Sequence, residues 1–304
     1  MTALATQPQF ETEAAWLAER LKRIGASEAA SVLGVNPYQS PIELYYRKTG
    51  QLPPEKESLP MKIGKLMEPV LCRLYEDQLG WTVERKQEFV VSKEYPFMAA
   101  TLDGVTTGVD GEPDTIVELK TANIRRSEEW GESGTDEVPL PYLVQVQHQM
   151  IVTGLSLAHV AVLIGNSDFR VYHVPRHDKL CAKIIDREAD FWRAVEARKP
   201  PKDRPEDAAI FARLAPQFEA EVDLSDNFEA QTNLDLYRYY GDEIKKLEDQ
   251  RNEYKHRLIR SMAHHATARL SDGTILKRAT VKKKSYVVEA SEYVQFSARK
   301  PKGA

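Results

Sequence analysis

The chain has only two cysteines among its 304 residues, and Cys72 and Cys181 stand far apart. Because they lack CxxC spacing, they exclude a disulfide framework and a cysteine-rich zinc or iron–sulfur site. Both lie in amphipathic helical patterns and are expected to be buried free thiols. No apolar run is long enough to span a bilayer, and no basic segment leads into an apolar one near the start. The sequence therefore predicts a cytoplasmic protein with no membrane partner.

An excess of positive charge is also lacking. The chain has 42 lysines and arginines against 46 aspartates and glutamates, a net charge of −4. Any binding of nucleic acid must therefore come from local basic patches, for which Lys62, Lys65, Arg85, Lys86, Arg125 and Arg126 are candidates. The apolar fraction of 42% is typical of globular proteins, and the length suits either one large domain or one domain with an appendage.

Apolar periodicity predicts an α/β core over residues 1–199. We expect a short helix that begins at Ser27 as its N-cap, and a hairpin around Gly165. The longer helices are predicted at 11–23, 61–79, 139–153 and 178–198, and the strands before the hairpin at 81–91, 97–103 and 115–121.

A proline-rich segment at 200–205 marks the end of this core. Residues 200–229 are predicted to be a linker and residues 230–304 an extension. Within it, apolar residues alternate at three and four positions from Tyr237 to Leu258, interrupted at Arg251. This spacing is typical of a long amphipathic helix of the coiled-coil kind, and a basic β-hairpin is predicted after it.

Three charged residues in the strand region form the most informative pattern of the chain. Asp103 ends one predicted strand, and Glu118 and Lys120 stand two residues apart on the next. Residues i and i+2 of a strand point to the same face, and an otherwise apolar strand carries charges mainly where something binds them. Two carboxylates beside an ammonium suit a divalent cation and a water next to a phosphodiester. A simple salt bridge within the strand is the alternative.

The residues around this pattern resemble a known family. Glu68 supplies a third acid in the first part of a predicted helix, where helix-dipole effects alone also favour acids. In order, the motifs are Arg20 to Ser27 with Gly34, Gly64 to Glu68, Asp103-Gly104, Glu118-Leu119-Lys120 and Gln145 to Met150. Over about residues 15–195 they resemble the YqaJ-type viral recombinases, the phage-type alkaline exonuclease family that includes lambda exonuclease, in the PD-(D/E)XK nuclease superfamily.

The resemblance implies a restriction-endonuclease-like core, with a central mixed sheet flanked by helices, followed here by the helical and β-hairpin extension. It also implies roles by position. Asp103, Glu118, Glu68 and the backbone carbonyl of Leu119 would hold two Mg²⁺ ions, for which Mn²⁺ can substitute. Lys120 would orient or deprotonate the attacking water, and the acids and Lys120 together would be catalytic.

A second group of residues is expected to hold the 5′-phosphate of the DNA strand. The resemblance implies Arg20, Ser27, Thr101 and Gln145, and a bidentate arginine suits a terminal phosphate. Lys22 and Arg23 remain alternatives to Arg20. Gln145 and Gln149 share one helix face, whereas Gln147 must point elsewhere.

The resemblance implies a Mg²⁺-dependent 5′→3′ exonuclease that digests linear double-stranded DNA. It would leave 3′ single-stranded tails for recombination by a single-strand annealing protein. A homotrimer and a phage or prophage origin in a bacterial host are implied as well. The alternatives are a site- or structure-selective endonuclease with the same core and a non-catalytic DNA-binding module.

Overall fold

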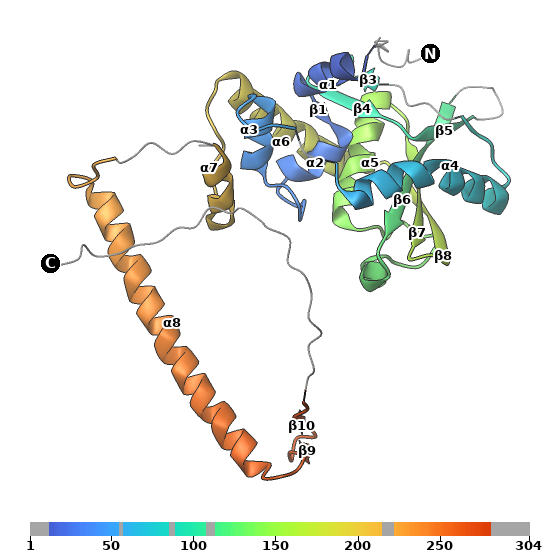
Figure 1. Ribbon diagram of the computed structural model, residues 1–304. Helices are drawn as coiled ribbons and strands as arrows, with labels where there is room; N and C mark the ends of the chain where they lie inside the picture. The colour runs from blue at the N-terminus through green and yellow to red at the C-terminus, as the bar shows by residue number, and fades with distance from the viewer. Residues whose placement is uncertain (1–11, 55–56, 85–88, 108–112, 215–221, 281–304) are drawn as a thin grey trace. The chain divides into compact units, whose positions relative to one another are not determined.

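The computed structural model describes residues 12–54, 57–84, 89–107, 113–214 and 222–280 (Figure 1). The predicted basic residues Arg85 and Lys86, and the end of the basic tail, lie outside these ranges. The chain forms two compact units, one up to Leu214 and one from Ala215.

A mixed five-stranded sheet lies at the centre of the first unit, with the strand order β2-β5-β6-β7-β8. Its strands are β2 (Val83–Glu84), β5 (Gly104–Thr107), β6 (Pro113–Ala122), β7 (Leu157–Ile164) and β8 (Asp168–Pro175). β6 runs parallel to β7, with Glu118 opposite Val160, and antiparallel to β5. The strand that carries Glu118 and Lys120 is therefore central, with a hydrogen-bonded neighbour on each side.

Helices cover both faces of this sheet (Figure 1). On one face, Val117 and Leu119 of β6 pack with Leu71 and Tyr75 of α4 (Leu59–Leu79). On the other face, alternate strand residues pack with α5 (Leu140–Thr153) and α2 (Ala26–Val32). Because successive side chains of β6 point to opposite faces of the sheet, Glu118 and Lys120 point toward α5. The predicted α/β core, a central mixed sheet flanked by helices, is confirmed.

A smaller three-stranded sheet joins the amino-terminal helices to the core. β1 (Ile24–Gly25) pairs in parallel with β4 (Met98–Thr101), which pairs with β3 (Phe89–Val91). Gly25 lies opposite Ala99 in this register. Around it lie α1 (Glu13–Leu21), α3 (Pro41–Lys48) and α6 (Asp178–Glu196), and η1 (Ile124–Glu129) follows β6 in the chain.

Three local predictions differ from the structure. Ser27 is not the N-cap of α2; Gly25 is, because the Glu28 carboxylate accepts a hydrogen bond from its amide and starts the helix earlier. The predicted strand 81–91 contains two short strands of different sheets, β2 and β3. The predicted strand 97–103 ends at Thr101, and β5 is an additional strand. Gly104 permits it, because a Cβ there would lie 2.4 Å from Val83 Cγ1.

The region predicted as a linker contains ordered structure. η2 (Pro205–Asp207) and α7 (Ala208–Leu214) belong to the first unit, where Ile210 packs with Ile42 and Leu52. The second unit contains α8 (Phe228–Ser261) and the hairpin of β9 (Thr267–Arg269) and β10 (Ile275–Lys277). The long helix and the hairpin of the predicted extension are confirmed.

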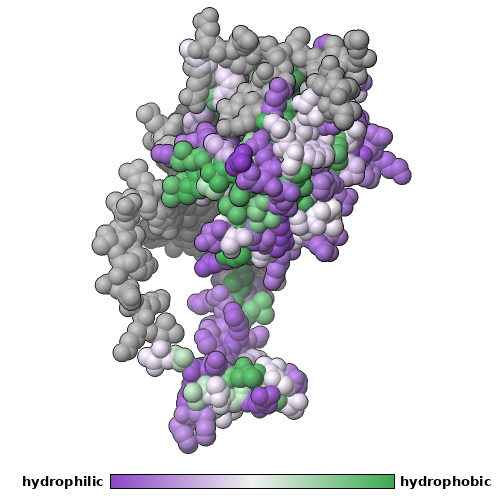
Figure 2. Space-filling model, turned by 90° about the vertical axis from the view of Figure 1, so that its right-hand side faces the viewer, coloured by the Kyte–Doolittle hydropathy of each residue, from purple (hydrophilic) through white to green (hydrophobic). Residues whose placement is uncertain are grey.

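Figure 2 shows one face, on which apolar residues form separate groups among polar ones. In the part of the chain that the structure describes, no helix combines the length and the apolar character needed to cross a membrane. Cys72 and Cys181 are buried free thiols, as predicted.

Candidate active site

Three of the predicted catalytic residues meet where β4, β5 and β6 come together. Asp103 lies in the short connection between β4 and β5, and its Oδ2 accepts a 2.9 Å hydrogen bond from the Leu119 amide of β6. Lys120 Nζ donates to Glu118 Oε1 and forms an ion pair with it. Loop and strand are thus held together by the residues of the predicted motif itself.

Glu118 is the most enclosed member of this cluster, at 2% exposure. Its Oε1 also accepts from Gln145 Nε2 at 2.6 Å, and its Oε2 accepts from Gln149 Nε2 at 2.6 Å. A buried carboxylate needs such partners, because an unpaired buried charge is strongly unfavourable. Helix α5 therefore fixes Glu118 through two residues one turn apart.

Lys120 lies between the acids and an aromatic ring. Its side chain is 21% exposed, and its Nζ lies 5.4 Å from the centre of the Tyr142 ring on α5. Burial disfavours its charge, but attraction to Glu118 and Asp103 outweighs burial and holds the pKa of Lys120 above its usual value. Lys120 is therefore a fixed cation whose ammonium group lies beside the carboxylates of Glu118 and Asp103.

Electrostatic coupling identifies the acids as one cluster. Burial and repulsion from Glu118 raise the pKa of Asp103 to about 7, opposed by Lys120 and the Leu119 amide. Glu68 of α4 adds to this repulsion, so its carboxylate acts on Asp103 from a separate element. A Cβ at Gly64, one turn before Glu68, would lie only 4.0 Å from Thr121 Oγ1, which shows how closely α4 approaches β6. An excess of negative charge collects around Asp103.

The described residues contain no group of three or more histidine, cysteine, aspartate and glutamate side chains arranged as a ready-made metal site. Lys120 is instead the cation that pairs with Glu118. One acceptor nearby is unused: the buried Gln149 Oε1 has no hydrogen-bond partner within the described part of the chain. Such an oxygen is suited to a hydrogen bond from a water or a metal-bound water.

Three of the predicted phosphate-binding residues, Arg20, Ser27 and Thr101, lie around the small sheet. Arg20 stacks on Trp16, with its guanidinium carbon 4.8 Å from the ring centre. Its Nη2 would lie 3.7 Å from a Cβ on Gly25, next to the start of α2 that carries Ser27. Because β1 and β4 are parallel, Thr101 lies at the same edge, two residues before Asp103.

The alternatives to Arg20 are engaged elsewhere. Lys22 and Arg23 both form ion pairs with Glu19, and Arg23 Nε also donates to the Pro96 carbonyl. Within the described residues, the Arg20 guanidinium has no carboxylate partner. Arg20 is therefore the basic group of this segment that is best placed for an anion.

The fourth predicted phosphate contact, Gln145, lies on α5 and contacts Glu118 in this structure. The prediction that Gln147 points away is confirmed, because it binds the Pro175 carbonyl and the His177 amide on the opposite side of α5. Sequence reasoning placed Gln149 on the Gln145 face but gave it no role. The spacing of four residues between Gln145 and Gln149 indicated that both face the site. No comparable pattern in the sequence indicated that Tyr142 lies near Lys120.

Lys48 is a further group that sequence reasoning missed. Its side chain is 1% exposed, and it forms a 2.6 Å ion pair with Glu28 Oε2. Its Nζ also donates to the backbone carbonyls of Arg20 and Arg23, just after the last turn of α1. It joins α3 to the segment that carries Arg20 and to the start of α2.

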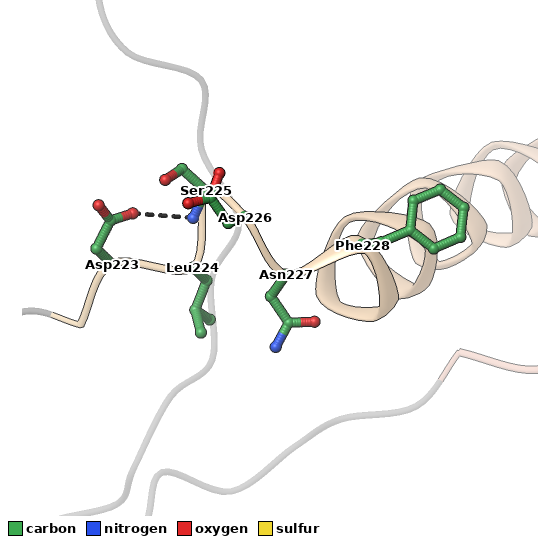
Figure 3. A pocket seen from close by; sticks show the side chains of 6 residues that line it. All are labelled: Asp223, Leu224, Ser225, Asp226, Asn227 and Phe228. Carbon is green, nitrogen blue, oxygen red and sulfur yellow. Dashed lines mark hydrogen bonds between the residues drawn. The ribbon is translucent and has the colours of Figure 1, made fainter.

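The second unit contains a surface hollow that is formed by residues far from this cluster in the sequence. It is lined by six consecutive residues, Asp223–Phe228, just before and at the start of α8 (Figure 3). Asp223 Oδ1 accepts from the Ser225 amide at 2.9 Å, so this carboxylate closes a local turn. We take the acid cluster as the candidate active site instead, because there Asp103, Glu118 and Glu68, from three separate segments, come together around Lys120.

The first unit is similar in sequence to viral recombinase domains. Residues 15–156 match the family model described as the YqaJ-like viral recombinase domain. A Bacillus subtilis (strain 168) protein, named uncharacterized protein YqaJ, is 37% identical over 180 residues. That match covers 58% of this chain and 54% of the relative, so the chain spans about half the length of the relative. The family resemblance read from the motifs is confirmed.

Two solved structures are similar to part of this chain. An alkaline exonuclease (LHK-Exo) from Laribacter hongkongensis is 23% identical, with a TM-score of 0.49, and the match covers 62% of this chain and 94% of that one. A phage related exonuclease from Haemophilus somnus 129PT is 11% identical, with a TM-score of 0.42, over 58% of this chain and 96% of that one.

Proposed function

We propose that the chain is a Mg²⁺-dependent 5′→3′ exonuclease that digests linear double-stranded DNA. The observation that carries this proposal is the convergence of Asp103, Glu118 and Lys120, with Glu68 acting on Asp103 from α4. Here the negative charge of the acids exceeds the positive charge of the one lysine. Such a site suits a divalent cation and the hydrolysis of a phosphodiester. The family match of residues 15–156 supports a nuclease role in recombination.

The residues present fit Mg²⁺ by their chemistry. The raised pKa of Asp103 reports negative charge that a divalent cation would neutralise, and the unpartnered Gln149 Oε1 would accept from a water bound to it. Asp103, Glu118, Glu68 and the Leu119 carbonyl would hold two ions, for which Mn²⁺ can substitute. When bound, these ions would lower the pKa of the attacking water and neutralise the phosphate charge.

The protein's own residues do the remaining work. Lys120 is held in its charged form beside Glu118, so it can orient the attacking water and stabilise charge that develops on the phosphoryl oxygens. Gln145 and Gln149 fix the Glu118 carboxylate from two directions. Ligation of a cation by Glu118 Oε1 requires Lys120 or Gln145 to release this oxygen.

The proposed direction of digestion rests on the second group of residues. Arg20, with Ser27 and Thr101 at the same edge, would hold the 5′-phosphate of the digested strand. The product would be a 3′ single-stranded tail for a single-strand annealing protein. We further propose a homotrimer that acts in the bacterial cytoplasm and is encoded by a phage or prophage.

The test uses end-labelled duplexes in Mg²⁺. We expect label at 5′-phosphorylated ends to be released progressively, and covalently closed circles to be spared. Cutting of closed circles would instead identify a site- or structure-selective endonuclease. Binding of duplex with no cleavage in Mg²⁺ or Mn²⁺ would identify a non-catalytic DNA-binding module.

A further inference from the structure

Helix α8 carries an apolar stripe whose side chains are largely exposed. It is a single continuous helix of 34 residues (Figure 1), about 51 Å long at 1.5 Å per residue. None of its residues is buried. The stripe consists of Tyr237, Tyr240, Ile244, Leu247, Tyr254 and Leu258, which are 44–63% exposed. Helices of this kind gain most of their stability by packing an apolar face, so α8 needs a partner surface.

The spacing of the stripe specifies another helix as that partner. Its residues recur at alternating intervals of three and four, which is the heptad pattern of a coiled coil. Tyr237, Ile244, Arg251 and Leu258 occupy the first core position of each heptad. Tyr240, Leu247 and Tyr254 occupy the second. A sheet edge or a globular groove would not require this strict repeat.

Charges on α8 disfavour a parallel pairing with its own copy. In a parallel coil, Arg251 would face Arg251 of the second copy inside the core. Glu243 would also face Glu248 of the second copy at the flanking positions, because flanking residues five apart meet there. Both contacts bring like charges together, and the contact of Glu243 with Glu248 occurs twice by symmetry.

An antiparallel pairing removes these contacts. We propose that α8 forms an antiparallel coiled coil with α8 of a second copy of this chain, in the register that places Ile244 against Leu247. Tyr237 then lies against Tyr254, and Arg251 against the ring of Tyr240, where a guanidinium and an aromatic face attract. The flanking Glu243 lies beside Gln250, and Glu248 beside Gly241.

This pairing doubles the number of chains in whatever assembly the first unit forms. If the first unit is a trimer, a three-fold ring cannot pair its helices antiparallel within itself, so the helices join two rings about two-fold axes. If the first unit is monomeric, the chain is a dimer. In both cases the full assembly contains twice as many chains as the assembly of the first unit alone. This expectation does not depend on nuclease activity.

The first test measures the mass of the full chain in solution by light scattering. Ile244→Glu with Leu247→Glu places charges at the centre of the stripe and is expected to halve the mass. The matched control is Asn252→Glu with His256→Glu, which adds the same charge on the outer face and is expected to keep the wild-type mass. Equal masses for the wild type and the stripe variant would overturn the proposal, because α8 would then be covered by its own chain or by another protein.

The second test fixes the orientation even if the stripe variant fails to fold. Tyr237→Cys and Tyr254→Cys are made singly and together, and the proteins are oxidised. The two positions are about 26 Å apart within one helix, so they cannot join within one chain. We expect a covalent dimer only from the double variant. A covalent dimer from Tyr237→Cys alone would overturn the antiparallel arrangement, and so would its absence from the double variant.

Discussion

The amide group of Gln149 donates a 2.6 Å hydrogen bond to Glu118 Oε2, and both side chains are buried. The carboxylate that the motif places at the centre of the site is therefore held by a residue outside the three-residue motif. Residues that position a metal ligand in this way affect metal affinity by about 10- to 100-fold.

We expect Gln149→Met to raise the Mg²⁺ concentration required for half-maximal cleavage by about 10-fold or more. Methionine keeps the volume of the side chain but cannot donate to Glu118. The measurement is the initial rate of nucleotide release across a Mg²⁺ titration. Gln147→Met is the control, since Gln147 bonds to Pro175 and His177 on the other side of the helix. An equal shift in both variants would show that helix α5 is perturbed as a whole.

Lys120→Met is expected to lower the cleavage rate by about 10³-fold and to leave duplex binding largely unchanged. The substitution removes the cation beside Glu118 and keeps much of the side-chain volume. Single-turnover cleavage and a binding titration in Ca²⁺ measure the two effects. Lys183→Met on the exposed side of α6 serves as the control. Cleavage at the wild-type rate would show that Lys120 is not catalytic.

Arg20→Ala is expected to slow digestion about 10-fold or more on 5′-phosphorylated ends and much less on 5′-hydroxyl ends. A charge-assisted contact to a terminal phosphate is lost only when that phosphate is present. Lys22→Ala is the matched control, because Lys22 is 68% exposed and pairs with Glu19. If both types of end slow equally, Arg20 does not read the phosphate.

Much of this fold follows from apolar periodicity. Helices α4, α5 and α6 were predicted to within a few residues, and α8 was predicted as a long helix. Each of the four has a long apolar stripe at helical spacing. Strand β5 was missed because it has only four residues and begins at a glycine, and its pairing with β6 is a tertiary feature. The N-cap of α2 was misassigned because Glu28 caps Gly25 from inside the helix.

The site shows the same division. Asp103, Glu118 and Lys120 could be found because charges interrupt apolar strands in a known order. Lys48 could not, because a lysine within a helical segment normally extends into solvent, and its burial depends on contacts with α1 and α2. Gln149 shares its helix face with Gln145, but only the structure shows that both reach the same carboxylate.

The buried pair of Lys48 and Glu28 gives a prediction on stability. Burial lowers the pKa of Lys48, opposed by the attraction of Glu28, so this ammonium depends on its partner. Lys48→Met is expected to cost about 3–5 kcal/mol of unfolding free energy, because it leaves the Glu28 charge without its cation. The variant that also carries Glu28→Gln should lose less. Urea unfolding of the two single variants and the double variant measures the coupling, and additive losses would contradict it.

His159 should make the stability depend on pH. It is buried between Tyr75, whose hydroxyl lies 2.6 Å from Nδ1, and His173, whose Nδ1 lies 2.8 Å from Nε2. Burial, with a smaller effect of His173, lowers the pKa of His159 to about 4. Between pH 6.5 and 4 the unfolded chain therefore binds a proton that the folded protein does not, so stability is lost as the pH falls through this range. The loss is at most about 3 kcal/mol.

The measurement is the unfolding free energy of the wild type and of His159→Gln at pH 7, 6, 5 and 4. Glutamine can accept from Tyr75 and donate to His173 but does not titrate. Asp103 has a raised pKa and contributes with the opposite sign in this range, so the difference between the two proteins isolates His159. We expect the stability of the variant, relative to wild type, to improve steadily from pH 7 to pH 4. The exposed His264, changed to glutamine, should follow the wild type throughout. A constant difference between His159→Gln and wild type would mean that His159 takes up its proton equally in the folded and unfolded chains.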